Sequence, residues 1–191
     1  MTEKGVLWSY RDPDHRLEDG IRIIASDLGG GVWAADLFGR YRIRRIGGDG
    51  ELSRTLEPKR NWFLDWRTSK EIADPNAPHG SRSSPQARVL DLLVDSGRLW
   101  VLGSTVDRRW ERARHDGYYD VGLSSDNIVE VFDIESGALL ASARVDLDAS
   151  LWMAFAGPGR VWAAETYEVS NRISVWEIEF TDLAAVDSDI R

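Results

Sequence analysis

Apolar and polar residues alternate along this chain in short runs that are separated by glycine-rich turns, a pattern typical of β-strands. Three stretches repeat one order of features: a turn glycine, then an aliphatic residue next to a tryptophan. They occupy residues 31–35, 97–101 and 159–163, and their tryptophans are Trp33, Trp100 and Trp162. A repeated order of this kind predicts three copies of one structural unit.

Each predicted unit begins with an apolar strand, at residues 21–25, 89–94 and 151–156. A turn leads to the strand that carries the tryptophan, and an alternating third strand follows at 40–46, 128–134 and 172–180. In the first two units, the tight turns Asp49-Gly50 and Ser136-Gly137 lead to a fourth strand, at 51–56 and 138–145. The sequence therefore predicts an all-β fold of three four-stranded antiparallel β-propeller blades, half of a six-bladed ring.

We expect one domain over residues 1–191, with blades at about 20–58, 86–146 and 150–180. The tryptophans are further apart than the roughly 40 to 50 residues of one blade. Two insertions account for the excess: residues 58–85, which hold four of the six prolines, and residues 105–127, between the second and third strands of the second blade. The third blade has no clear fourth strand after Phe180. The isolated strand predicted at residues 5–10 is the candidate to complete it.

Three blades leave a ring open, because propellers close with four to eight. Three solutions follow from the pattern. Two chains could form a six-bladed ring, the chain could be one half of a longer protein or the complement of a partner, or the blades could stack as an open wedge capped by the insertions. The first solution is favoured, since it closes the ring with identical parts.

Composition narrows the classes of partner. Nine tryptophans favour a β-rich fold. A net charge of −8 argues against nucleic acid as a partner, and the basic stretch 40–45 is interpreted as a solvated strand face. The chain has no cysteine, no recognisable signal peptide and no apolar run long enough to span a membrane. The lack of a recognisable signal peptide predicts a cytoplasmic protein by default.

Several stretches together resemble one family. They are residues 62–63, 97–102, 107–110, 116–120, 127–133, 136–141 and 173–176. Taken together they resemble the C-terminal half of uncharacterised bacterial six-bladed β-propeller proteins of the NHL/TolB-like group. The resemblance spans roughly residues 20 to 180 and implies the fold alone, because no functional residue can be carried over. It implies an extracytoplasmic location if the chain is a fragment.

Catalytic chemistry has weak support in the sequence. A propeller-type metal-dependent hydrolase or lactonase would need acidic residues that converge on the channel, and no pair has diagnostic spacing. The three histidines lie in separate polar stretches, so no zinc site is indicated. We therefore predict no catalytic residue, no metal and no cofactor. The acidic residues that have suitable positions are Asp27, Asp91, Asp95, Asp146 and Glu165.

The two insertions provide the candidate binding residues, because aromatic and arginine side chains are enriched at interface hot spots and long loops often carry binding sites. The tryptophans of the repeat are instead expected to pack between blades. The leading hypothesis is a non-catalytic propeller module that binds a protein partner or self-associates, with the hydrolase and a carbohydrate-binding module as alternatives. The candidate residues are Arg108, Trp110, Arg112, Tyr118 and Tyr119 in the second insertion, and Trp62 and Phe63 in the first.

Overall fold

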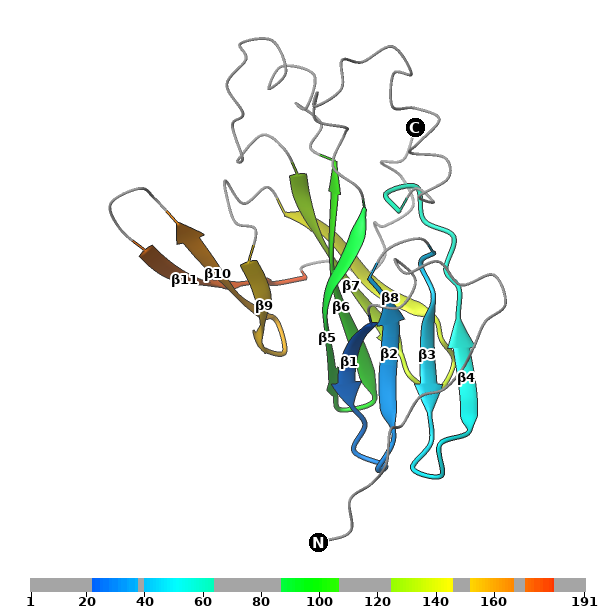
Figure 1. The fold of residues 1–191 in the computed structure, drawn as a ribbon. Helices are drawn as coiled ribbons and strands as arrows, with labels where there is room; N and C mark the ends of the chain where they lie inside the picture. The colour runs from blue at the N-terminus through cyan, green and yellow to red at the C-terminus, as the bar shows by residue number, and fades with distance from the viewer. Residues whose placement is uncertain are drawn as a thin grey trace, which may run out of the picture.

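The computed structural model describes residues 22–37, 40–63, 87–106, 125–145, 152–166 and 171–180, and within these ranges the chain is all-β (Figure 1). The strands form three separate antiparallel sheets. The first contains β1 (Arg22–Ser26), β2 (Val32–Asp36), β3 (Ile43–Ile46) and β4 (Leu52–Leu56). The second contains β5 (Arg88–Asp95), β6 (Arg98–Val106), β7 (Ser125–Asp133) and β8 (Leu139–Val145). The third contains β9 (Trp152–Gly157), β10 (Arg160–Thr166) and β11 (Asn171–Glu177).

Each sheet is a meander in which every strand pairs with the next one along the chain. The predicted all-β class is confirmed, and so is the order of four antiparallel strands in the first two sheets. The tight turns depend on glycines with positive φ, at Gly50 (88°) and Gly137 (75°). In the third sheet the described strands number three. The strand predicted at residues 5–10 lies outside the described residues, so its place in that sheet stays a prediction.

The ladder between β6 and β7 is longer than the sequence pattern suggested. Thr105 pairs with Asp126 and Val106 with Ser125, so both ends of the segment expected as an insertion at 105–127 belong to the sheet. The polar residues at this end of the ladder obscured its length, because an exposed insertion and a buried polar strand end look alike in sequence. Here Thr105, Asp126 and Asn127 are buried.

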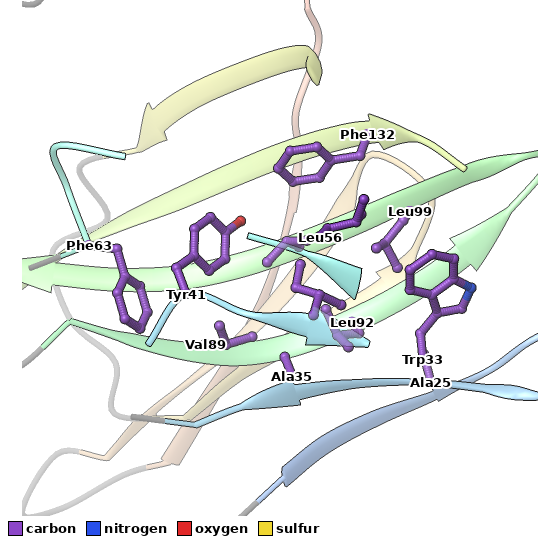
Figure 2. Packing of buried hydrophobic residues seen from close by; sticks show 12 residues of the cluster. Ala25, Trp33, Ala35, Tyr41, Leu56, Phe63, Val89, Leu92, Leu99 and Phe132 are labelled. Carbon is purple, nitrogen blue, oxygen red and sulfur yellow. The ribbon is translucent and has the colours of Figure 1, made fainter. Parts of the chain in front are cut away.

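The three sheets stack face to face, with a hydrophobic cluster in each of the two spaces between them. In Figure 2 the first cluster joins side chains of the first sheet, such as Trp33, to side chains of the second, such as Leu99. The second cluster joins the opposite face of the second sheet to Met153 and Val161 of the third. The members of the first cluster are Ala25, Trp33, Ala35, Tyr41, Ile43, Leu56, Phe63, Val89, Leu92, Leu99, Val101 and Phe132.

The first strands of the sheets lie next to one another, β1 against β5 and β5 against β9. Hydrogen bonds from and to β5 also connect the sheets: the Val89 N–H donates over 3.1 Å to the O of Leu37, directly after β2, and Asp91 Oδ2 accepts a bond from the Phe155 N–H of β9 over 2.8 Å. Successive sheets are therefore joined at their first strands as well as through the clusters between their faces.

The repeated tryptophan has a fixed direction in the stack, because side chains alternate between the two faces of a strand. Trp33 belongs to the cluster between the first and second sheets, and Trp100 to the cluster between the second and third. The indole N–H groups of both are buried without a hydrogen-bond partner, so these side chains contribute through packing. In each case the tryptophan faces the sheet that follows it along the chain.

Candidate interaction surface

The third sheet carries the same apolar face as the first two, but no described sheet covers it. The strand registers make the comparison direct. Ile43, Val129 and Ile173 occupy equivalent positions, since each pairs with the residue two places after the repeated tryptophan. Ile43 and Val129 are 0% and 1% exposed, whereas Ile173 is 73% exposed. The same position of the repeat is thus buried in the first and second sheets and exposed in the third.

The residue opposite the tryptophan repeats this contrast. Val131 pairs with Trp100 and is 4% exposed, whereas Val175 pairs with Trp162 and is 59% exposed. Ala154 flanks Trp162 on the other side, as Ala25 flanks Trp33. Trp162 itself is partly buried and belongs to neither cluster. We call the surface formed by Ala154, Trp162, Ile173 and Val175 the Trp162 face.

The other end of the stack also has an open apolar position. Ile24, Leu92 and Met153 are equivalent, because each pairs with the residue directly after the tryptophan. Leu92 and Met153 are 5% and 6% exposed, and Ile24 is 54% exposed. Val32, which pairs with Ser26, lies half-buried on the same side of the sheet. We call the surface formed by Ile24 and Val32 the Ile24 face.

Part of the sheet around the Ile24 face is closed. Ala34 and Ile46 point to this side and are buried. The Arg42 guanidinium forms a 2.9 Å ion pair with Asp36, and Arg44 lies 4.0 Å from the same carboxylate. The open apolar surface is therefore limited to the part of the face around Ile24.

Of the candidate binding residues of the first insertion, Phe63 belongs to the cluster between the first and second sheets (Figure 2), and Trp62 packs against that cluster. The Tyr41 ring stacks on Phe63, with centroids 5.1 Å apart, and meets Trp62 edge-on at 5.0 Å. The Trp62 ring also lies over Gly103, where a Cβ atom would approach it to 2.5 Å. Phe63 is buried and Trp62 is half-buried, so their contacts are mainly with the protein's own core.

A buried carboxylate anchors this aromatic group. Glu130 accepts a 2.6 Å hydrogen bond from the Tyr41 hydroxyl and a 3.1 Å bond from the Trp62 indole N–H. Arg60 Nε lies 2.9 Å from the same carboxylate and forms an ion pair with it, although its N–H is not aligned for a hydrogen bond. Burial, followed by the charge of Glu130, raises the pKa of Tyr41 well above its ordinary value. These contacts hold Arg60 and Trp62, in the described part of the first insertion, against the second sheet.

The candidate residues of the second insertion lie outside the described ranges, so their role in binding stays a prediction. They are Arg108, Trp110, Arg112, Tyr118 and Tyr119.

Of the acidic residues considered for channel chemistry, Asp91 lies in β5 and forms a hydrogen bond to β9, the first strand of the third sheet. Its carboxylate accepts hydrogen bonds from the backbone N–H groups of Phe155 and Leu92, at 2.8 and 2.9 Å. Burial raises its pKa, and these two bonds act in the opposite direction. Asp27 pairs with Arg45. Asp146 and the side chain of Glu165 are outside the description, and the described residues contain no cluster of acidic or histidine side chains that could hold a metal.

Two further features concern partners. In the basic stretch 40–45, Arg42 and Arg45 are engaged by Asp36 and Asp27, so their charges are compensated locally. Within the described ranges there is no helix with the length and apolar character needed to cross a membrane.

No protein-family model matches this chain, and a search of curated proteins returns no match.

Ile24, Ile173 and Val175 were not among the binding residues predicted from the sequence. For Ile24 and Ile173 a signal was nevertheless present, because their positions are apolar in both other units, whereas the position of Val175 is Val131 in the second unit and Arg45 in the first. The position of Ile24 is Leu92 and Met153 elsewhere, and the position of Ile173 is Ile43 and Val129. An apolar position is buried only if a neighbour covers it, and which sheet lacks a neighbour is a property of the stack.

Proposed function

We propose that this chain is a non-catalytic β-propeller-type interaction module whose Trp162 face binds a further sheet, supplied by a protein partner or by another copy of the chain. The observation that carries the proposal is the contrast between Ile43 and Val129, which are buried, and Ile173, which is exposed at the equivalent position. In both internal contacts, the tryptophan side of one sheet is covered by the next sheet. The third sheet also has a tryptophan side, and a further sheet would cover it in the same way.

The propeller-type arrangement is supported by three features of the described sheets. They are meanders of consecutive strands, they pack face to face, and their first strands lie next to one another. An apolar sheet face that is left exposed favours association with another protein surface. Burial of Ile173 and Val175 on binding would repeat the packing of Val129 and Val131 inside the chain.

The proposal is tested by a substitution that places a charge on the Trp162 face. We expect Ile173→Asp to fold normally but to lose association, measured as native mass by light scattering and as recovery of co-purifying proteins from the source cells. The carboxylate would have to be buried in the contact without a counter-ion, which is costly. Folding is checked by circular dichroism and tryptophan fluorescence.

Two matched variants define the interpretation. Val129→Asp puts the same charge at the equivalent buried position and should prevent folding. Leu28→Asp puts it in the β1–β2 turn, where Leu28 is exposed, and should change neither folding nor association. A wild-type chain that is monomeric and recovers the same proteins as Ile173→Asp would contradict the proposal.

A further inference from the structure

The geometry points to a specific occupant of the Trp162 face: the Ile24 face of a second copy of this chain, so that two chains form a closed ring of six sheets. This inference rests on the proposed function and names its partner. Each copy would provide the Trp162 face for one contact and the Ile24 face for the other.

The two contacts between sheets within the chain have the same composition. Each contact joins a tryptophan side, with Ile43 or Val129, to the opposite side of the following sheet, with Leu92 or Met153. Ile173 and Ile24 occupy these same two positions of the repeat. The chain therefore exposes, one at each end, residues that correspond to the two sides of the contact that it makes twice inside.

The residue directly before each repeated tryptophan also shows an open position at the first sheet. Leu99 and Val161, which directly precede a repeated tryptophan, are fully buried by the preceding sheet's tryptophan side. Val32 has this position in the first sheet and is half-buried. A second copy would bring its Trp162 against Val32, as Trp33 and Leu99 meet in the first cluster.

Two chains of three sheets can also close a ring. A contact between two different faces either forms a ring or extends into a filament. Propeller rings contain four to eight blades, and two chains of three sheets give six. Two copies related by a two-fold axis make both contacts at once, so neither apolar end stays exposed. Three of the six exposed large apolar side chains among the described residues, Ile24, Ile173 and Val175, lie on the two end faces and would be covered in the ring.

The test uses the full chain and two single variants, Ile24→Glu and Ile173→Glu. Wild type should have twice the mass of one chain by light scattering. Each variant alone places a glutamate in both contacts of the pair, so its dissociation constant should rise by roughly 100-fold or more. Mixing the two variants should restore a dimer, because one contact then joins an unmodified Trp162 face to an unmodified Ile24 face.

A charge swap gives an independent test. The double variant Ile24→Lys with Ile173→Glu should regain the dimer that Ile24→Lys alone loses, since lysine and glutamate would face each other in both contacts. Leu28→Glu, an exposed position away from both faces, is the control for added charge. Circular dichroism of every variant confirms that the monomers are folded.

The outcomes separate the inference from the proposed function. A dimer that survives Ile24→Glu but not Ile173→Glu would indicate two Trp162 faces packed against each other, and would overturn the six-sheet ring. A monomeric wild type would also overturn it. If that monomer still captured another protein through Ile173, the proposed function would stand with a different partner.

Discussion

Replacement of Tyr41 by phenylalanine isolates the contribution of one buried hydrogen bond. The substitution keeps the ring that packs against Trp62 and Phe63 and removes the hydroxyl that donates to Glu130 over 2.6 Å. Hydrogen bonds to charged groups are each worth about 1.5–3 kcal/mol. Glu130 is buried, so water cannot replace the lost donor. We expect Tyr41→Phe to reduce the free energy of unfolding by about 2 kcal/mol.

The assay is urea unfolding at pH 7, followed by the fluorescence of the nine tryptophans. A loss of this size should also lower Tm by roughly 4 to 8 °C for a chain of this length. The matched comparison is Thr105→Val, which removes another buried hydroxyl of the same region. Thr105 Oγ1 donates to the neutral carbonyl of Trp62 over 2.7 Å, so its loss should cost less, about 1 kcal/mol.

The pH dependence gives a second signature of the same bond. Burial and the charge of Glu130 raise the pKa of Tyr41 well above 10.0, so the folded state holds this proton more tightly than the unfolded state. The contribution is complete below pH 10 and is lost as pH rises from 10 toward the raised value, at about 1.36 kcal/mol per pH unit. Tyr41→Phe lacks this slope. A variant within 0.5 kcal/mol of wild type (roughly the measurement error), or an unchanged alkaline slope, would refute the reasoning.

Three further predictions concern the same framework. Gly103→Ala should destabilise the chain by about 1–3 kcal/mol in urea unfolding, because its Cβ would meet the Trp62 ring at 2.5 Å; an unchanged midpoint would show that Trp62 moves freely. Asp91→Asn should gain stability relative to wild type as pH rises from 3 to 7, because the raised pKa of Asp91 makes its ionisation unfavourable in the folded state; parallel stability curves would contradict this. Trp33→Ala should reduce the free energy of unfolding by about 3–5 kcal/mol, because Trp33 is fully buried. Trp162→Ala, measured in the monomeric Ile24→Glu background, should cost less because Trp162 is only partly buried; equal losses would argue against an open Trp162 face.

Strand positions were the most predictable feature of the chain. The alternating pattern and the glycine turns located β1 to β11 to within a few residues, because side-chain period and turn chemistry are both local. The ends of β6 and β7 were missed because buried Thr105 and Asp126 look like loop residues in sequence. The packing partners of Trp62 and Phe63 were also out of reach of local pattern. Their contacts with Tyr41 and Glu130 join residues far apart in the chain.

The candidate surface was predictable only in part. The repeat indicated that three sheets leave open faces, but the exposed residues on them could be named only from strand register. Ile173 and Val129 differ in exposure because of what lies next to their sheets, and neither residue's own neighbours in sequence encode that difference. Position in the stack decides whether an identical pattern forms a core or a surface.

The stacking of the sheets also has a consequence for how the molecule unfolds. The second sheet contributes side chains to both hydrophobic clusters, whereas the first and third sheets each contribute to one. In a linear array whose stability comes from nearest neighbours, the units at the ends open first and the middle unit last. In a monomeric variant such as Ile24→Glu, amide exchange should therefore be slowest in β6 and β7, the central strands of the second sheet. A closed ring would remove this gradient, because a ring has no end units.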